Sequence, residues 1–381
     1  MSLSCSVENN SEITIPFSYE YGRIVLDAVI NRQAGKFIFD TGSFYSFAGV
    51  STLGLFPIGY TETIIGGKRK NNLVYSLNRI QIGDVKIKSR SMLINRDDVI
   101  TRIKKVEEYD GILGIRTFEG FWMELSFSRN EIILHKQKPE YFEDAIHSRL
   151  EMMSKFSVLY LPIDIDGNKF LMNIDTGLQQ GFFFPNDIIN DKPPEDLRLI
   201  ASNGEIGDFY LVRTNSINVM DRTYSGKLIM NNSYTAARRF WESHTDTGIM
   251  GLAFMRHYDF LFDYRNLRDG KTAGMYYIPL TPPEERDYSF FSFLIEAPGL
   301  GVINACSCQC EEGMTIFSVL TDSPAYIEYG LKPGSVITKI NGKPVHSFSM
   351  NEIRDPLFFD WATELTVLND EKDGEVHFKL K

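Results

Sequence analysis

The sequence predicts a mainly β protein in which two related halves are followed by a small α+β domain. Short segments rich in Val, Ile and Phe, often separated by Gly, Asn or Asp, run through the first 280 residues or so. An Asp-Thr-Gly triplet recurs together with its surroundings at a nearly constant offset. A stretch rich in proline and charged residues at 279–287 then precedes a segment with a different pattern, which indicates a domain boundary.

The apolar segments are short, as strands are, and long patterns with a 3.6-residue period are scarce. Each segment is bounded by residues that favour turns. The expected strands include residues 13–17, 23–30, 37–39, 80–82, 86–88 and 131–134.

The Asp-Thr-Gly triplet occurs at corresponding places in an internal duplication. Residues 36–43 (KFIFDTGS) align with residues 171–178 (LMNIDTGL), so that Asp40 and Asp175 lie 135 positions apart. In both copies an apolar strand leads into the triplet. The alignment therefore predicts that each half presents one aspartate at the end of a strand.

Two further landmarks keep the same order and nearly the same spacing. The segment GILG that ends at Gly114 matches GIMG that ends at Gly251, at an offset of 137. Residues 123–130 (MELSFSRN) resemble residues 260–266 (FLFDYRN), and their final asparagines are offset by 136. Three landmarks with one spacing rarely arise by chance, which favours two related halves.

The duplication and the composition shifts divide the chain into domains. The first half is expected at 1–138 and the second at 157–281, with a linker at 139–156 that contains a helical stretch at 141–153. The C-terminal domain is expected at 290–381.

With two Asp-Thr-Gly triplets, each followed about seventy residues later by an apolar-apolar-Gly segment, the chain resembles the pepsin-like and retropepsin-like aspartic proteases over residues 12–280. The resemblance implies that the two halves are β-barrel lobes around a cleft. It also implies that Asp40 and Asp175 are the catalytic carboxylates of an endopeptidase that needs no cofactor. Two carboxyl groups a few ångströms apart cannot both ionise, so they share one proton. The ionised group takes a proton from the attacking water, and the protonated group donates to the developing oxyanion.

The resemblance also implies supporting roles around the two aspartates. Gly42 and Gly177 let the loops turn tightly beside the carboxylates. The hydroxyls of Thr41 and Thr176 bond across to the other half and hold both loops rigid. The other expected members are Ser43 beside Asp40, and Gly114 and Gly251 beneath the loops.

Leu178 departs from the family pattern, in which Ser, Thr or Ala usually follows the triplet. Ser43 can donate a hydrogen bond to Asp40 and favour its ionised form, whereas Leu178 offers no such donor to Asp175. We therefore expect the shared proton to reside mainly on Asp175. The same departure leaves a second interpretation open, a non-catalytic peptide-binding protein on a protease scaffold.

The flap hairpin is the second departure from the pepsin type. The sequence shows no flap tyrosine; the corresponding hairpin is expected at residues 63–67, with Gly66 and Gly67 as its mobile tip, closer to the retropepsin-like style. Residues 201–204 are the expected counterpart in the second half.

A single Asp-Thr-Gly can simply be a turn after a strand. Composition gives about one chance triplet per ten chains of this length, and this chain contains a third copy at 246–248. Mostly polar residues precede that copy, and Gly248 already belongs to the segment that matches residues 111–114. Asp246 is therefore expected to be incidental and to lie away from the other two aspartates.

The C-terminal segment resembles a PDZ domain over residues 290–381. The resemblance rests on residues 323–325 (SPA), 330–337 (GLKPGSVI) and 340–345 (INGKPV). It implies a peptide-binding loop at Gly299, Leu300, Gly301 and Val302, where backbone N–H groups capture a peptide C-terminus while the chain adds to a sheet edge. The alternative is a packing domain that binds no peptide.

Composition limits the partners. There are 40 basic and 50 acidic residues, a net charge of −10, and the best basic run is only Lys68-Arg69-Lys70, so nucleic-acid binding is not expected. No apolar stretch is long enough to span a bilayer, and no signal peptide is visible. The expected partners are polypeptide substrates and peptide C-termini.

The sequence does not fix the cellular compartment. The PDZ-like domain and the excess of acidic residues favour a bacterial, extracytoplasmic protein, either periplasmic or lipid-anchored through Cys5.

Other chemistries find no support in the sequence. No G-x-S-x-G, H-E-x-x-H or P-loop motif occurs, and the six histidines have no metal-ligand spacing. Cys306, Cys308 and Cys310 alternate, which fits neither a paired C-x-x-C zinc site nor an unstrained disulfide. They are interpreted as incidental thiols, and no metal is expected.

Overall fold

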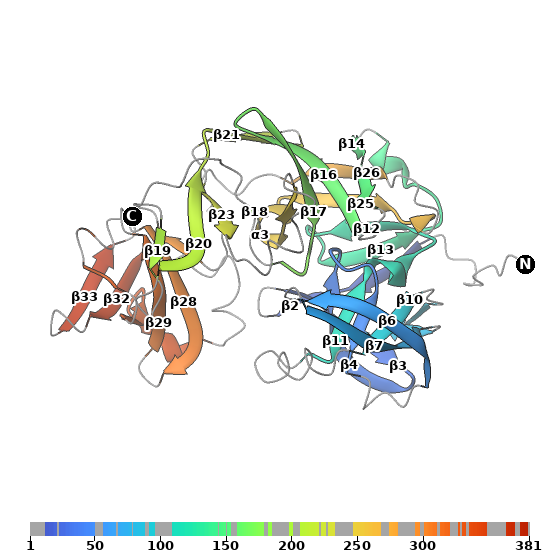
Figure 1. Cartoon of the computed structure of the whole chain (residues 1–381), viewed down its shortest axis with the longest axis horizontal. Helices are drawn as coiled ribbons and strands as arrows, with labels where there is room; N and C mark the ends of the chain where they lie inside the picture. The colour runs from blue at the N-terminus through green and yellow to red at the C-terminus, as the bar shows by residue number, and fades with distance from the viewer. Residues whose placement is uncertain are drawn as a thin grey trace, which may run out of the picture.

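The computed structural model shows a mainly β protein made of several sheets (Figure 1). The described helices include α3 (Leu252–Met255) and three short 3-10 helices. The structure describes residues 12–20, 23–49, 56–65, 68–77, 79–87, 91–95, 109–143, 145–149, 151–153, 158–178, 182–184, 198–200, 206–220, 222–225, 228–232, 247–267, 274–280, 294–297, 301–310, 313–320, 327, 330–332, 335–348, 363–369 and 374–379.

We call residues 12–135 the first repeat. In this repeat β4 pairs with β3 on one side and lies parallel to β11 on the other, and the ladder continues through β5, β10 and β7 to the edge strand β6. Its elements are β1 (Glu12–Pro16), β2 (Ser18–Glu20), β3 (Arg23–Ile30), β4 (Gln33–Asp40), β5 (Ser46–Ala48), β6 (Pro57–Ile65), β7 (Lys68–Leu77), β8 (Ile80–Ile82), β9 (Val85–Ile87), β10 (Ser91–Asn95), β11 (Gly111–Gly114), η2 (Ile115–Phe118), β12 (Trp122–Ser126) and β13 (Glu131–His135).

We call residues 146–279 the second repeat. Its elements are β14 (Ile146–Arg149), β15 (Glu151–Met153), β16 (Val158–Ile165), β17 (Asn168–Ile174), β18 (Phe182–Phe184), β19 (Arg198–Ile200), β20 (Ile206–Arg213), β21 (Ser216–Val219), β22 (Arg222–Ser225), β23 (Leu228–Asn232), β24 (Thr247–Met250), α3, β25 (Tyr258–Asp263) and β26 (Gly274–Pro279). η3 (Glu140–Phe142) lies between the repeats.

The strand pairing of the second repeat reproduces that of the first. β17 pairs with β16 and lies parallel to β24, as β4 does with β3 and β11. From β24 the ladder continues through β18, β23 and β20 to β19, which repeats the order β11, β5, β10, β7 and β6. The duplication expected from three sequence landmarks therefore extends to the order and direction of the strands.

A six-stranded sheet joins the two repeats, in the order β1-β13-β12-β25-β26-β14 (Figure 1). Its centre is the antiparallel pair β12–β25, in which Met123 lies opposite Phe262 and Leu125 opposite Phe260. β12 is buried along its whole length, whereas the edge strand β1 alternates between exposed and buried residues. One hydrophobic cluster contains residues of both repeats, so the repeats share a core.

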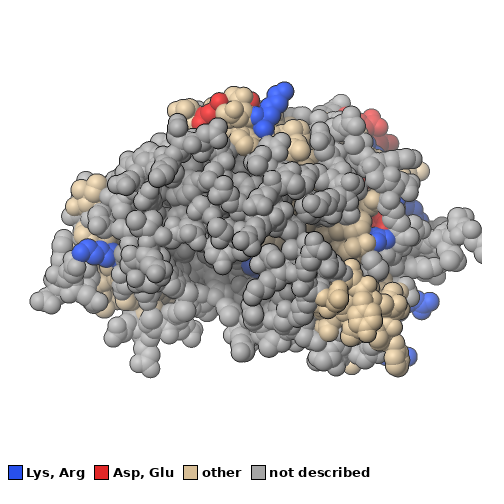
Figure 2. All heavy atoms as spheres, in the orientation of Figure 1, with Lys and Arg blue, Asp and Glu red and all other residues tan. Residues whose placement is uncertain are grey.

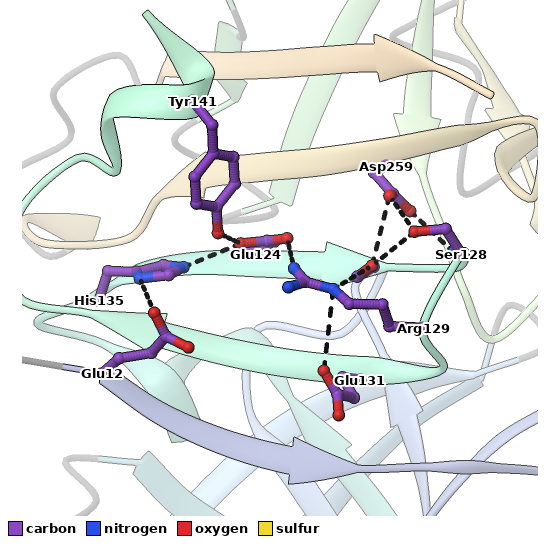
Figure 3. A network of polar contacts seen from close by, with 9 residues as sticks. Glu12, Glu124, Ser128, Arg129, Glu131, His135, Tyr141 and Asp259 are labelled. Atoms are coloured by element: carbon purple, nitrogen blue, oxygen red, sulfur yellow. Dashed lines mark hydrogen bonds and ion pairs between the residues drawn. The ribbon is translucent and has the colours of Figure 1, made fainter.

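A polar network lies within this sheet around the buried Glu124 (Figure 3). Its carboxylate accepts hydrogen bonds from Tyr141 and Arg129, and one of its oxygens lies 2.9 Å from Nε2 of His135. Asp259 of the second repeat accepts a 3.0 Å hydrogen bond from the backbone N–H of Ser128 in the first. These hydrogen bonds and ion pairs compensate charged groups that would otherwise be costly to bury, and they add polar contacts between the repeats.

The described C-terminal strands form a series of antiparallel pairs: β27–β28, β28–β29, β29–β30, β30–β32 and β32–β33. Figure 1 shows these strands at the end of the molecule opposite the N-terminus. β29 also pairs with β19, where Leu199 lies opposite Leu320. The elements are β27 (Leu294–Ala297), β28 (Gly301–Cys310), β29 (Gly313–Leu320), β30 (Val336–Ile340), β31 (Lys343–Pro344), η6 (Val345–Ser347), β32 (Glu364–Asn369) and β33 (Gly374–Lys379).

The predicted strands are confirmed, with ends shifted by up to a few residues, as β1, β3, β4, β8, β9 and β13. The predicted helix at residues 141–153 is wrong. After η3 the chain forms β14 and β15, which pair antiparallel with β26 and β16. The pairing partners of these two strands come from distant parts of the chain and override the helix propensity of the local sequence.

The edge strand β6 and the residue before it expose large apolar side chains. Phe56, Ile58 and Tyr60 are all exposed, and the pairing of β6 with β7 shifts register between Pro57 and Gly59. Figure 2 shows uncharged residues gathered on the surface in this part of the molecule.

Candidate active site

Asp40 and Asp175 end corresponding strands in the two repeats. Asp40 is the last residue of β4, and Asp175 follows directly after β17. A turn follows each of them: the N–H of Ser43 donates to the carbonyl of Asp40, and the N–H of Leu178 donates to the carbonyl of Asp175. The structure thus places both Asp-Thr-Gly triplets in strand-to-loop turns of the same kind.

The two loops exchange hydrogen bonds through buried threonines. The hydroxyl of Thr41 donates to the carbonyl of Ile174 at 2.8 Å and accepts from the N–H of Thr176 at 2.9 Å. The hydroxyl of Thr176 donates to the carbonyl of Phe39 at 2.7 Å and accepts from the N–H of Thr41 at 3.0 Å. Four reciprocal bonds between residues so distant in sequence fix the two triplets against each other.

The carboxyl groups of Asp40 and Asp175 are hydrogen-bonded to each other. Each also lies against the glycine of the opposite triplet. A methyl group on Gly42 would lie 2.4 Å from the carboxyl carbon of Asp175, and one on Gly177 would lie 2.7 Å from that of Asp40. Any larger residue at these positions would displace a carboxylate, so glycine is required by close approach.

The surroundings of the two carboxyl groups differ. Asp40 accepts hydrogen bonds from the hydroxyl of Ser43 at 2.6 Å and from the N–H of Gly42 at 2.8 Å. Asp175 accepts one from the N–H of Gly177 at 2.7 Å, and Leu178 has no side-chain donor. Burial of its carboxyl group, followed by the charge of Asp40 and the hydrogen bond with it, raises the pKa of Asp175 well above its ordinary value. The hydrogen bonds and the direction of this shift favour the ionised form of Asp40 and the protonated form of Asp175.

Gly114 lies against the first loop, and Gly251 lies between Met250 and Leu252, whose backbone groups bond to Asp175 and Leu178 of the second loop. A methyl group on Gly114 would lie 2.5 Å from the carbonyl oxygens of Ser43 and Tyr45, which leaves room only for glycine. The residues that follow support the loops in the same way: the N–H of Ile115 donates to Ser43, and that of Leu252 donates to Leu178.

Two arginines near the loops are not indicated by any sequence motif. Arg116, in η2, is buried, lies over the rings of Phe44 and Tyr45 and forms a 3.0 Å ion pair with Glu119. It thereby supports the chain that follows the first triplet. Arg23, at the start of β3, donates a hydrogen bond to the carbonyl of Gly177. A lone arginine carries no motif, so only the tertiary structure brings either one to the site.

Several expected site residues lie outside the described residues. They are Gly66 and Gly67 at the tip between β6 and β7, residues 201–204, Asp246, and Gly299 and Leu300 of the expected peptide-binding loop. Gly301 and Val302 begin β28, where they lie opposite Ala297 and Glu296 of β27.

Among the described residues, no group of three His, Cys, Asp or Glu side chains could hold a metal ion. No helix in the same part of the chain has both the length and the apolar character needed to cross a membrane.

Comparison of the chain with known protein families gives no match, and comparison with curated proteins gives none either. The chemistry of the site is therefore inferred from its geometry.

Replacing Leu178 with serine is expected to lower the upper apparent pKa of the aspartate pair. A hydroxyl at this position could donate to Asp175 as Ser43 donates to Asp40, and so favour the ionised form. The alkaline limb of the pH–rate profile should then move to lower pH. Leu178→Ala shortens the side chain without adding a donor and serves as the control. Equal movement of the limb in both variants would contradict the role of the hydroxyl.

Proposed function

We propose that the chain is an aspartic endopeptidase whose catalytic dyad is Asp40 and Asp175. The single observation that carries the proposal is the hydrogen-bonded carboxyl pair, held between two loops that the threonine hydroxyls lock together. The two repeats then correspond to the two lobes of a pepsin-like or retropepsin-like protease. The matching strand order of the repeats supports this assignment.

The asymmetry of the pair assigns the proposed roles. Asp40, stabilised as a carboxylate by Ser43 and Gly42, takes a proton from the water that attacks the peptide carbonyl. Asp175, which carries the shared proton, donates it to the carbonyl oxygen as negative charge develops there. Base and acid both come from the chain itself, so the proposed reaction calls for no metal and no cofactor.

The direct test is cleavage of a peptide library by the full chain from acid to neutral pH. We expect endopeptidase activity with a bell-shaped pH profile, because only the singly protonated pair contains both a base and an acid. A correctly folded chain that cleaves no peptide at any pH in this range would contradict the proposal.

Leu178 favours the second candidate, a peptide-binding protein on a protease scaffold. Without a side-chain donor at this position Asp175 holds the shared proton more firmly, which makes it a weaker general acid. In that case the chain should bind peptides without cleaving them, and binding should persist in the Asp175→Asn variant.

We further propose that residues 290–381 form a PDZ-like domain that recruits peptide C-termini through the loop at 299–302. The consecutive antiparallel strands β28, β29, β30, β32 and β33 support this assignment. In the structure β27 occupies the edge of β28 next to that loop, and β29 occupies the other edge. Addition of a peptide strand beside Gly301–Asn304 therefore requires β27 to leave this edge.

Deleting residues 290–381 should raise KM for long substrates with a free C-terminus, while short peptides keep their kcat. The deletion removes a second binding site that raises the local substrate concentration but takes no part in bond breaking. Because β29 pairs with β19, the deletion can also weaken the second repeat. The point variant Leu300→Glu keeps β29 and serves as the comparison, since its charge repels a peptide carboxylate. Equal losses on short and long substrates, together with a lower Tm, would favour a bracing role instead.

A further inference from the structure

Arg23 connects the first repeat to the second aspartate loop. It is the first residue of β3, and its guanidinium donates a hydrogen bond to the carbonyl of Gly177, 154 positions further along the chain. Gly177 in turn donates its N–H to the carboxylate of Asp175. One side chain of the first repeat thus holds the residue whose N–H donates to the second aspartate.

The duplication has no second copy of this arginine. β3 and β16 occupy the same place in the two repeats, and β16 begins with Val158 where β3 begins with Arg23. The residue after each triplet differs in the opposite way. Ser43 supplies a hydroxyl donor beside Asp40, whereas Leu178, after the second triplet, supplies none. The aspartate without a hydroxyl donor is therefore the one with the arginine.

We propose that Arg23 is a positioning residue that replaces the hydroxyl missing at Leu178: it anchors the Gly177–Leu178 loop and places a positive charge beside Asp175. This inference rests on the proposed function. In that reaction Arg23 does not touch the substrate. Its positive charge keeps Asp175 acidic enough to give up the shared proton at the pH at which the protease acts.

The charges around Asp175 support this role. Among the described residues, the charged groups that act on its carboxyl are Asp40 at the end of β4 and Arg23 at the start of β3, and the N–H of Gly177 is its neutral donor. The positive charge of Arg23 lowers the pKa of Asp175, against the larger upward effects of burial and of Asp40. Loss of this charge leaves only the peptide N–H to favour the ionised form.

The test is the titration of the Asp175 carboxyl carbon, followed by NMR in the full-length protein labelled with 13C-aspartate. The signal is assigned by its loss in Asp175→Asn. In Arg23→Gln we expect the midpoint to move upward by about one pH unit, as for removal of an arginine next to an aspartate. Adding Leu178→Ser to Arg23→Gln should return part of the shift. A midpoint unchanged in Arg23→Gln would overturn the proposal.

Arg23→Lys separates charge from shape, because it keeps the charge and loses the planar guanidinium. We expect its midpoint to stay within a few tenths of a unit of wild type. An upward shift as large as that expected for glutamine would assign the effect to loop geometry alone and contradict the proposal. If Arg23→Gln does not fold, Arg23→Met takes its place, because it also removes the charge and should move the midpoint upward by a similar amount.

The NMR titration does not depend on catalysis, so it separates the two hypotheses. If the wild-type chain cleaves no peptide but the titration shifts as expected, the endopeptidase proposal fails and the pairing of Arg23 with Asp175 stands. If the chain is active, both limbs of its pH–rate profile should move upward in Arg23→Gln. Activity lost equally at every pH, with no movement of the limbs, would indicate a merely structural residue.

Discussion

Replacing Asp40 or Asp175 with asparagine should reduce peptide cleavage by about 10³-fold or more, because either change removes the base or the shared proton. An asparagine keeps the size of the side chain and can still hydrogen-bond, so loss of the loop structure is not the expected cause. Asp27→Asn, on the exposed side of β3, changes the net charge by the same amount and should retain full activity.

The melting temperature of Asp175→Asn provides a check on folding. The pKa of Asp175 is raised above its ordinary value of 3.8 in the folded state, so below 3.8 both states hold the proton and the group has little effect. At higher pH the unfolded chain releases this proton more readily, which destabilises the folded chain. The variant lacks this penalty, and its Tm should exceed that of wild type near neutral pH, with a smaller difference in acid. Cleavage retained by a folded Asp175→Asn would contradict the dyad.

Replacing Thr41 or Thr176 with valine should produce the largest loss of stability among single changes at the site. Thr41→Val leaves the carbonyl of Ile174 and the N–H of Thr176 without their partner, in a position where both threonines are almost fully buried. Two unsatisfied buried groups cost about 2–5 kcal/mol in the free energy of unfolding. Denaturant unfolding of each variant measures this cost.

Thr14→Val, on the exposed face of β1, is the matched control and should change the free energy of unfolding by less than about 0.5 kcal/mol. The double variant Thr41→Val with Thr176→Val should lose less than the sum of the single losses, because the two hydroxyls belong to one network. Additive losses would show that the two threonines act independently and that the exchange does not couple the loops.

The sequence by itself determined the mainly β class and the duplication. Strands such as β1, β3 and β13 could be predicted because their apolar residues occur in short runs bounded by turn residues. The Asp-Thr-Gly triplets could be aligned because each repeat needs a glycine where the opposite carboxylate approaches closely, and that requirement is visible as a motif.

Only the tertiary structure decided those strands and side-chain contacts whose partners lie far away in the chain. Residues 141–153 were predicted to be helical from local composition, but β26 and β16 supply strand partners and draw this segment into sheets. Arg23 and Arg116 carry no motif, and their roles arise from contacts with Gly177, Phe44 and Tyr45. Patterns of apolar and turn residues act over a few positions, whereas the charge beside Asp175 depends on how two repeats pack, and packing is a property of the whole chain.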